Sequence, residues 1–502
     1  MNAKHIAALS AVLFMSTPNV FAEWVSLQQH SDILFGIDFE SPEQGWVCGA
    51  RDGIGPVIKN SDDSGATWGY QTQEMNNMFW MDVDMADTRY GWSSGLVALI
   101  GKWGIAGTTD GGTTWTPQMD KFRIAALLDI EAYDRNHAWA AGDWVAPIFQ
   151  EKRGVMRTTD GGANWETQGW DLPEAPRFLD FVDANHGFVS CGHWPSEGDD
   201  AARFWRPTEQ YPVTFEMPEE WAERGKSDEA DYGCIVAATS NGGATWQQVF
   251  SSTDYYPNHI DFTSRTEGWM VVEGGAPRVT QILRTTNSGR SWTRQPHPLE
   301  GGEIGSITTV NMLNRREGWV VGWGSTRFGN PETRFLHTMD GGENWAVDPF
   351  TSNVGPIHTT FVDEGSGWTA GGNNNNISRV LGYSNPSRAP KATLEVTQAP
   401  ETARGNATIS YTVALKNLTN GVINSDGWVQ ITGPTLAGYE SNVVIRRNLR
   451  IPGNHSRLHK VSLALPDLPN GTYAVESILG TAESENPLDI NAYAQFSLLV
   501  GS

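Results

Sequence analysis

An internal repeat constrains the fold of this chain more than any other feature of its sequence. A small residue followed by an aromatic one recurs seven times, and successive aromatic residues stand 46 to 50 positions apart except for one interval of 81. A period of this length predicts supersecondary units that pack on their neighbours and bury a shared core. The seven pairs are Gly45-Trp46, Gly91-Trp92, Ala138-Trp139, Gly187-Phe188, Gly268-Trp269, Gly318-Trp319 and Gly367-Trp368.

Six of these units carry a second signal, an octet that begins with Ser or Thr and ends with Trp. Asp or Asn stands at its third position and Gly at its fifth. The Asp or Asn side chain accepts hydrogen bonds from the backbone that follows it, and Gly adopts the left-handed conformation. The octet therefore predicts a hairpin turn closed by Trp. The octets are Ser61–Trp68, Thr108–Trp115, Thr158–Trp165, Thr239–Trp246, Thr285–Trp292 and Thr338–Trp345, and the seventh unit has only the degenerate Tyr383-Ser384-Asn385-Pro386.

A short apolar stretch with strand character precedes each small-aromatic pair. Each unit thus supplies an inner strand, a second strand at the pair, a third strand, the octet turn and a fourth strand. Four strands at this period are typical of a propeller blade, so we expect an all-β, seven-bladed propeller over residues 23–388. The inner stretches are 33–39, 79–85, 125–130, 178–182, 260–262, 307–312 and 357–362.

The octet resembles the aspartate box, or bacterial neuraminidase repeat. With Gly-Trp ahead of it, as at Thr158–Trp165 and Thr338–Trp345, the full unit is similar to the photosystem II stability and assembly factor family of seven-bladed propellers. The resemblance covers residues 24–388. It implies a non-enzymatic factor that holds a protein on a propeller face or assists the assembly of a complex, although propellers as a class host many functions.

The two ends of the chain predict an export signal and a second domain. Residues 1–22 combine Lys4, an apolar stretch and Val20-Phe21-Ala22, which is typical of a signal peptide cleaved after Ala22 and predicts a periplasmic or secreted protein. Residues 385–391 read as a linker. Seven alternating stretches follow in about 110 residues, which predicts a small immunoglobulin-like or fibronectin-like β-sandwich over residues 389–502.

Charge and motif content exclude several classes of function. The formal net charge of -23 argues against nucleic acid, which requires Lys and Arg to neutralise phosphates, and against anionic membranes. No later stretch is long and apolar enough for a membrane helix. The 11 His show no metal-ligand spacing, and no phosphate-binding loop or nucleophile elbow occurs. We therefore expect no cofactor and no metal, and a monomeric protein.

The three cysteines lead to one disulfide prediction. Cys191 and Cys234 flank the long insertion at 192–233, and export would allow a bridge, so we predict that they pair. Cys48 is then left over and is expected to be buried inside a blade.

Length variation indicates which end of the propeller recognises a partner. The octet turns and the loops ahead of the small-aromatic pairs are expected on one rim. The variable segments at 50–56, 143–153, 192–233, 325–334 and 373–376 all fall on the other, which we take as the binding face. Arg and Trp are frequent binding anchors, although each residue there has an equally simple interpretation as an ordinary solvated loop residue. The candidate residues are Arg51, Trp103, Arg123, Asp143, Trp144, Arg177, His193, Trp194, His259, Arg327, Arg334 and His358.

A polar residue recurs eight positions before each aromatic residue of the repeat. One interpretation is a cation or ligand site on the propeller axis, since hard cations prefer oxygen ligands. The other, which we favour, is that each side chain caps backbone N–H groups of its own turn. The residues are Asp38, Asp84, Glu131, Asp180, Asp261, Asn311 and Thr360.

Two classes of function remain. Aspartate boxes occur in sialidases and xyloglucan-cleaving enzymes, so a glycoside hydrolase is the alternative, and it would need paired carboxylates. Phe122-Arg123-Ile124-Ala125 lacks the Pro of the sialidase motif, and acidic residues such as Glu197, Asp199 and Asp200 are common throughout the chain. We therefore favour an exported binding or assembly-factor propeller whose partner is a protein or an extracellular glycan.

Overall fold

The computed structural model contains only β-strands as regular structure in the residues that it describes. No described segment is a helix of the length and apolarity needed to cross a bilayer. The predicted signal peptide and residues 386–391 of the predicted linker at 385–391 lie outside the described residues. The described residues are 23–51, 55–71, 79–97, 104–119, 124–145, 151–167, 172, 174–193, 232–274, 279–299, 306–325, 331–372, 378–385, 392–400, 402–404, 406–417, 423–432, 441–451, 456–465, 471–480 and 490–501.

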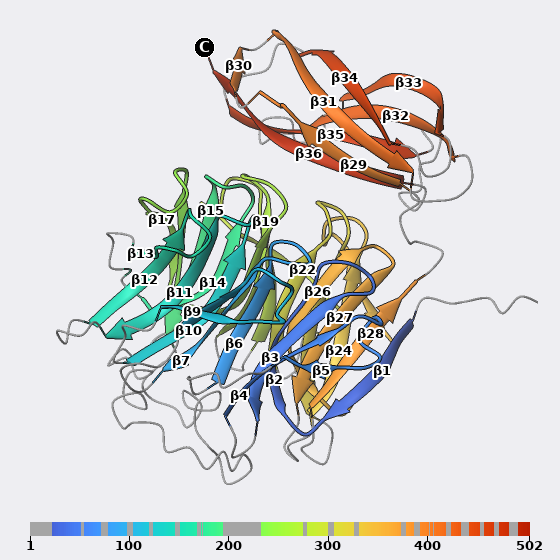
Figure 1. Cartoon of the computed structure of the whole chain (residues 1–502). Helices are drawn as coiled ribbons and strands as arrows, with labels where there is room; N and C mark the ends of the chain where they lie inside the picture. The colour runs from blue at the N-terminus through green and yellow to red at the C-terminus, as the bar shows by residue number, and fades with distance from the viewer. Residues whose placement is uncertain are drawn as a thin grey trace, which may run out of the picture.

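The strands before residue 385 form seven antiparallel four-stranded units, which we call blades 1 to 7 (Figure 1). This arrangement confirms the predicted all-β propeller. Blades 1 to 3 consist of β2 (Ile33–Phe39), β3 (Gly45–Arg51), β4 (Gly55–Ser61) and β5 (Gly69–Tyr70); β6 (Phe79–Met85), β7 (Gly91–Val97), β8 (Ile105–Thr108) and β9 (Thr116–Met119); and β10 (Ile124–Ala132), β11 (Ala138–Val145), β12 (Glu151–Thr158) and β13 (Glu166–Thr167).

The next three blades repeat this plan. Blades 2 and 3 are further joined into one sheet, because β10 pairs with β7 at Ala125–Val97 and Ala126–Leu96. Blades 4 to 6 consist of β14 (Pro176–Phe181), β15 (Gly187–His193), β16 (Gly233–Thr239) and β17 (Gln247–Ser252); β18 (Tyr256–Phe262), β19 (Gly268–Gly274), β20 (Val279–Thr285) and β21 (Thr293–Gln295); and β22 (Ser306–Met312), β23 (Gly318–Ser325), β24 (Pro331–Thr338) and β25 (Ala346–Asp348).

Blade 7 is completed by the N-terminal strand, which the repeat pattern did not predict. Its strands are β26 (Gly355–Asp363), β27 (Ser366–Gly372), β28 (Ser378–Ser384) and, outermost, β1 (Glu23–His30). Trp24 of β1 is buried, stacks on Phe335 of blade 6 with ring centroids 4.1 Å apart, and meets Trp319 edge-on at 5.7 Å. Blade 7 has no complete octet of its own, so β1 and Trp24 supply its fourth strand and its closing Trp.

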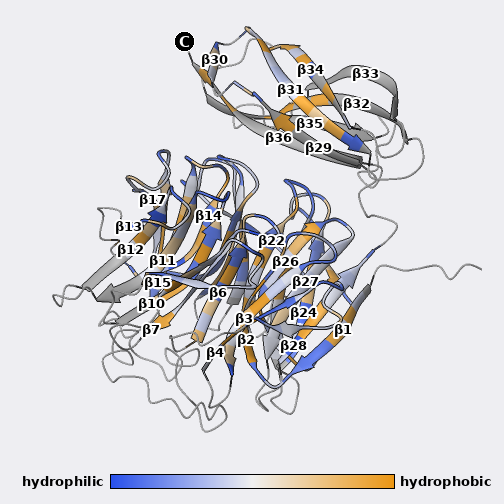
Figure 2. Ribbon diagram, in the orientation of Figure 1, coloured by the Kyte–Doolittle hydropathy of each residue, from blue (hydrophilic) through white to orange (hydrophobic). Residues whose placement is uncertain are grey.

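The octets form the predicted turns. In blade 2, Thr108 Oγ1 accepts a hydrogen bond from Gly112 N (2.8 Å), and Asp110 Oδ1 accepts one from Thr114 N (2.8 Å). Gly111 and Gly112 have φ values of 71° and 85°, so two successive residues are left-handed, which favours glycine. Hydrophilic residues gather at these turns and hydrophobic ones along the strands (Figure 2).

Each octet turn is hydrogen-bonded to the loop ahead of the small-aromatic pair of its own blade. The backbone N–H of Ser64 donates to the Glu43 carbonyl, and the same bond recurs in every blade, including Asn385 to Gly365 in blade 7. The prediction that these two loops share one rim is therefore confirmed. The other five bonds join Gly111 to Arg89, Gly161 to Asn136, Gly242 to Asn185, Ser288 to Thr266 and Gly341 to Arg316.

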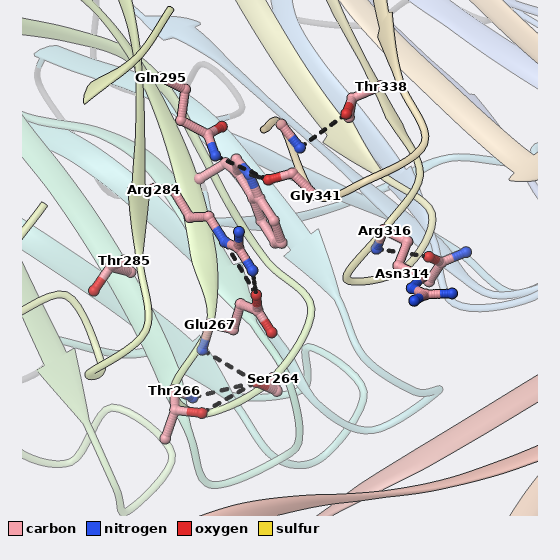
Figure 3. Close-up of polar contacts among 12 residues, drawn as sticks. Ser264, Thr266, Glu267, Arg284, Thr285, Gln295, Asn314, Arg316, Thr338 and Gly341 are labelled. Carbon is pink, nitrogen blue, oxygen red and sulfur yellow. Dashed lines mark hydrogen bonds and ion pairs between the residues drawn. The ribbon is translucent and has the colours of Figure 1, made fainter. Parts of the chain in front are cut away.

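The aromatic residues of the small-aromatic pairs join neighbouring blades. Trp269 Nε1 of blade 5 donates to the Gly341 carbonyl in the octet of blade 6 (3.2 Å), and Gln295 Nε2 donates to the same oxygen (2.9 Å; Figure 3). Trp46 and Trp139 make the same kind of bond to the next blade. Each buried cluster of the propeller likewise combines two adjacent blades; Trp139, for example, stacks on Phe181 of the next blade with ring centroids 3.6 Å apart. Stability therefore depends on blade-to-blade packing rather than on one central core.

The C-terminal residues form two sheets with a shared core. One sheet contains β29 (Ala392–Thr397), β31 (Thr408–Asn417) and β34 (Ser456–Ala464), and the other contains β30 (Thr402–Arg404), β36 (Ile490–Gly501), β35 (Gly471–Gly480), β32 (Ile423–Thr432) and β33 (Ser441–Ile451). Tyr411 and Val461 of the first sheet pack with Val429, Val475 and Leu498 of the second. Two packed sheets make this part a β-sandwich. Strand β30, parallel to β36, was not predicted.

The predicted Cys191–Cys234 disulfide is wrong. Cys191 pairs with Ile235 and Cys234 pairs with Gly192, so the two cysteines are one residue out of register on neighbouring strands. Side chains one register step apart point to opposite faces of a sheet. Cys191 accordingly packs between blades 3 and 4, and Cys234 packs between blades 4 and 5. Cys48 is buried in the core, as predicted.

Candidate binding face

The face opposite the octet turns is formed by the ends of the second strands, the starts of the third strands and the crossings between blades. We call it the strand-end face. Six of the twelve candidate residues have described side chains: Arg51, Arg177, His193, His259, Arg334 and His358. Trp103, Arg123, Trp194 and Arg327 lie outside the described residues, as does most of the insertion at 192–233; Asp143 and Trp144 are placed on β11 by their backbone alone.

Arg51, at the end of β3, is held in place while its side chain remains 43% exposed. Its guanidinium lies over the ring of Tyr70, with Cζ 4.7 Å from the ring centroid, and its Nε is 3.8 Å from Asp32 Oδ1. The hydroxyl of Tyr70 donates to Asp32 Oδ2 (2.8 Å). Cation–π stacking and a nearby carboxylate orient the guanidinium before any partner binds.

Asp32 is fully buried where blade 7 meets blade 1, the last and first blades of the ring. It lies in the crossing from β1 of blade 7 to β2 of blade 1, and Lys59 Nζ of β4 contacts its Oδ2 at 2.5 Å. Lys59 Nζ also lies 3.0 Å from His30 Nδ1. Burial and the charge of Lys59 lower the pKa of His30 to about 4. The imidazole of His30 is therefore neutral and can accept a hydrogen bond from the Lys59 ammonium.

Arg177, at the start of β14, has a similar arrangement in blade 4, three blades away from Arg51. Its Cζ lies 5.3 Å from the ring centroid of Tyr256 on β18, and its Nε and Nη2 both donate to the Gly192 carbonyl at 3.3 Å. A second arginine on this face is therefore stacked on a tyrosine and fixed by a hydrogen-bond acceptor.

His193 and Arg334 have acidic partners of their own. His193 Nδ1, at the end of β15, lies 2.6 Å from Glu174 Oε2. Arg334 Nη2, on β24, donates to Glu332 Oε2 (2.7 Å), and this hydrogen bond lowers the pKa of Glu332. Each of these two side chains is therefore positioned by a glutamate of its own blade or of the segment just before that blade.

His259 and His358 do not lie in loops of the strand-end face but on inner strands β18 and β26. Their rings are 5.9 Å apart although blade 6 separates their strands in sequence, and His358 Nδ1 is 3.9 Å from Asp82 Oδ1 of blade 2. Side chains from different sides of the ring meet here, so this level lies on the propeller axis. Burial, together with the His358 charge, lowers the pKa of His259 to about 3.

The inner polar ring joins each blade to the next one. Asp38 Oδ2 of blade 1 accepts a hydrogen bond from Met85 N of blade 2 (3.0 Å), and Asp84 Oδ2 accepts one from Ala132 N of blade 3 (2.6 Å). Glu131, Asp180 and Asp261 accept the bonds of Phe181, Phe262 and Met312 in the same way. We expected each side chain to cap backbone N–H groups of its own turn, and this expectation is corrected. These carboxylates accept backbone N–H groups of the next blade and so connect neighbouring blades.

A second set of carboxylates that bond to the next blade lies two residues earlier on the inner strands. Asp82 Oδ2 accepts from Ile130 N (3.2 Å), and Asp129 Oδ2 accepts from Leu179 N (2.5 Å). Asp82 and Asp129 are also hydrogen-bonded to each other. Burial raises the pKa of Asp82 to about 7 and, with the Asp82 charge, raises that of Asp129 well above its usual value, so the pair retains a proton.

The axial carboxylates act as hydrogen-bond acceptors between neighbouring blades. Among the described residues, no group of His, Cys, Asp and Glu is arranged to hold a metal ion. The backbone N–H groups that these carboxylates accept account for their repetition in successive blades.

Several residues of the strand-end face could not be identified from the sequence. Tyr70, Tyr256, Asp32 and Glu174 position the candidate side chains, but each comes from another strand or crossing than the residue it contacts. A weak signal existed for Tyr70 alone, because it stands two residues after Trp68, the last residue of an octet.

These features define an all-β propeller with repeated octet turns and a sandwich of two sheets after it. The family model described as "Photosynthesis system II assembly factor YCF48" matches residues 238–354, from the end of β16 to the approach to β26. No curated protein matches the chain.

Several solved structures are similar to this chain or to a part of it. A structure titled "YCF48 bound to D1 peptide" has a TM-score of 0.48 and 17% identity, and the match covers 72% of this chain and 97% of that one. The GH74 xyloglucanase from Xanthomonas campestris has a TM-score of 0.40, 8% identity and coverages of 94% and 81%. The CARDB domain of the PF1109 protein from Pyrococcus furiosus has a TM-score of 0.16, 19% identity and coverages of 22% and 93%.

Proposed function

We propose that this protein is an exported, non-enzymatic binding or assembly-factor propeller that holds a protein partner on its strand-end face. The observation that carries the proposal is the pair of oriented arginines, Arg51 on Tyr70 and Arg177 on Tyr256, which stand on one face in blades 1 and 4. Ordering a long side chain in advance removes part of the entropic cost of binding, and arginine is among the most frequent anchors of protein interfaces.

The opposite face is less suited to recognition. There the polar groups of the octets bond within the turn: Asp160, for example, accepts from Asn164 N (2.9 Å) and from Asn164 Nδ2 (2.8 Å). The hydrogen bonds from Asn164 lower the pKa of Asp160. Groups that are already paired contribute little to a new interface.

The chemistry of the oriented arginines favours a partner segment that carries carboxylates. A guanidinium fork binds a carboxylate through two parallel hydrogen bonds, and Arg51 keeps nearly half of its side chain accessible. The match of residues 238–354 to an assembly-factor model supports a role in holding or assembling proteins rather than in hydrolysis.

The competing function is glycoside hydrolysis, which needs two carboxyl groups separated by about 5 Å or more across the scissile bond. Asp82 and Asp129 form one carboxyl pair on the inner strands; they are hydrogen-bonded to each other, and each also accepts a backbone N–H of the next blade. That pair has no room for a sugar between its members.

The test compares three arginine variants with a control on the other face. Arg51→Ala, Arg177→Ala and Arg334→Ala are immobilised beside the unchanged protein, and recovery of each envelope protein is quantified by mass spectrometry. Arg290→Ala is the matched control, because Arg290 is exposed on the octet face. We expect one protein whose recovery falls about tenfold in the first three variants and not in the control.

Two results would contradict the proposal. The first is equal recovery of every protein by all four variants. The second is turnover of aryl glycosides or sialosides that a single carboxylate substitution abolishes, which would favour the hydrolase.

A further inference from the structure

The inner polar ring is open to solvent along the propeller axis. Its seven residues share one register on the innermost strands, eight positions before the aromatic residue of each small-aromatic pair. Each of the seven is partly exposed, whereas the residue directly before it on the same strand is buried. Solvent therefore reaches these side chains from the axis. The ring consists of Asp38, Asp84, Glu131, Asp180, Asp261, Asn311 and Thr360.

The five acids of this ring repel one another. Burial, and then the charges of Glu131 and Asp261, raises the pKa of Asp180 well above its usual value. The seven inner strands contain no Lys and a single Arg, Arg177, whose guanidinium lies over Tyr256 on the strand-end face. The inner strands thus offer the acids no basic partner at this level, and a cation on the axis would offset their repulsion.

An independent observation is a set of buried polar atoms that lack a hydrogen-bond partner near the axis. Glu131 Oε1 accepts the Phe181 N–H at 2.8 Å, but its Oε2 is buried and unpaired. Burial raises the pKa of Glu131 to about 8, and the charge of Asp261, two blades away, adds to this rise. An interaction that crosses blade 4 places the Glu131 carboxyl toward the axis. A buried polar atom without a partner is uncommon in a native protein and calls for an explanation.

Two more such atoms lie two residues earlier on the inner strands. His259 Nδ1 is buried and unpaired, and so is the hydroxyl of Thr309, which has the same register in the next blade. The His259 ring lies between Phe178, with centroids 4.8 Å apart, and His358, at 5.9 Å. This level therefore combines an aromatic wall with hydrogen-bonding groups that no protein donor satisfies.

From these observations we infer that the propeller axis binds an alkylammonium ion, supplied either by a lysine side chain of a partner protein or by a free diamine. The ammonium group would donate to Glu131 Oε2 and remain among the carboxyl groups of the ring. The ring of Phe178 would pack against the alkyl chain or a second ammonium group, which an aromatic face attracts. His259 Nδ1 and Thr309 Oγ1 would accept hydrogen bonds at the deeper level. This site is separate from the strand-end arginines and does not depend on the function proposed for them.

Other occupants satisfy fewer of these groups. Among the described residues, the His, Cys, Asp and Glu side chains are not grouped as ligands of a metal ion. An anion would add to the repulsion within the ring, and a neutral polyol would leave it unchanged.

Isothermal titration calorimetry of the full-length protein at low ionic strength tests the inference. The probes are putrescine and Nα-acetyl-lysine amide, with 1,4-butanediol as an uncharged analogue and calcium chloride as a metal control. We expect saturable 1:1 binding of at least one amine and none of the diol. Tighter binding of the lysine probe would identify a protein side chain as the source of the ammonium group, and tighter binding of putrescine would identify a free diamine.

Variants locate the site. Glu131→Gln should weaken amine binding at least tenfold, because the amide oxygen still accepts the Phe181 N–H but the group can no longer ionise. His259→Phe, which keeps an aromatic ring and removes the acceptor, should weaken binding as well. Glu343→Gln is the matched control, since Glu343 is exposed in an octet turn, and it should leave the affinity unchanged.

Four results would overturn the inference: no saturable binding of either amine, equal binding of the diol, unchanged affinity in Glu131→Gln, or calcium binding that Glu131→Gln abolishes. The amine that binds should also raise the melting temperature of the unchanged protein, a readout that needs no variant to fold. Amine binding that persists in the Arg51→Ala and Arg177→Ala variants would distinguish this site from the strand-end face.

Discussion

Trp368 of blade 7 donates its indole N–H to the carbonyl oxygen of Ser64 in the octet of blade 1, at 2.9 Å. The same bond joins Trp46, Trp139 and Trp269 to the next blade, so this one, across a sequence separation of 304 residues, closes the ring. A ring whose blades are stabilised mainly by their neighbours is sensitive to any weakness at the point of closure.

The first prediction concerns the strand that completes blade 7. Trp24→Ala should lower the free energy of unfolding by about 3 to 5 kcal/mol, because it removes a fully buried indole that stacks on Phe335. Val25→Ala, one residue away and 36% exposed, should change it by no more than about 0.5 kcal/mol. Denaturant unfolding followed by circular dichroism measures both, and equal stabilities would show that β1 does not close the ring.

A second prediction concerns Gly36, which leaves space for the axial groups. A Cβ at this position would lie 2.8 Å from Asp82 Oδ1 and 2.9 Å from both Asp82 Cα and Cys48 Sγ. Gly36→Ala should therefore destabilise the propeller by about 1 to 3 kcal/mol through overpacking. Gly69→Ala is the control, since its new Cβ would meet Asn60 Oδ1 at an ordinary 3.6 Å. Thermal melts of the two variants should differ, with Gly36→Ala lower; coincident melts would contradict the axial packing.

The sequence predicted those features whose interactions lie within a few residues of one another, and it missed those that join distant parts of the chain. The small-aromatic pairs and octets were recognisable because each turn bonds within a few residues, as Gly112 N does to Thr108 Oγ1. The role of Trp24 could not be recognised, because its partners Trp319 and Phe335 stand about 300 positions later in the sequence. The binding face was predicted only as a rim; the tyrosines that orient Arg51 and Arg177 come from other strands and have no sequence spacing in common.

The disulfide prediction failed for a related reason. Flanking an insertion brings two cysteines onto paired strands, but only the exact register decides whether their side chains share a face. Cys191 and Cys234 are offset by one residue. The inner acids were located correctly, yet their acceptor role toward the next blade depends on closure of the ring, which no single repeat reveals.

The pH dependence of stability is the third prediction. Burial raises the pKa of Asp38 to about 6, of Asp82 and Asp261 to about 7, and of Glu131 to about 8. The folded state then binds more protons than the unfolded chain between about pH 4 and pH 8, so the free energy of unfolding should decrease as the pH rises through this range.

Asp82→Asn tests this dependence, because an amide oxygen can still accept the Ile130 N–H but cannot ionise. Its stability should decline less between pH 5 and pH 8 than that of the unchanged protein. Asp62→Asn, at an exposed position of an octet turn, is the matched control and should leave the slope unaltered. A stability that rises with pH in the unchanged protein would show that the axial acids are ionised in the fold.

The last prediction concerns how much the buried ion pair between Lys59 and Asp32, at the junction of blades 7 and 1, contributes to stability. Lys59→Met removes the ammonium that contacts Asp32 and leaves a fully buried carboxylate with only the Tyr70 hydroxyl and the more distant Arg51 nearby. An unpaired buried charge typically costs about 3 to 5 kcal/mol, so this variant should be strongly destabilised. Asp32→Asn should be destabilising as well, because it leaves the buried ammonium of Lys59 beside the Tyr70 ring and His30 without a carboxylate. The double variant should therefore be more stable than Lys59→Met alone, with a coupling energy measurable in a double-mutant cycle by denaturant unfolding.

Strict additivity of the two changes would mean that Lys59 and Asp32 act independently, and that the crossing from blade 7 to blade 1 is held by its hydrophobic neighbours instead.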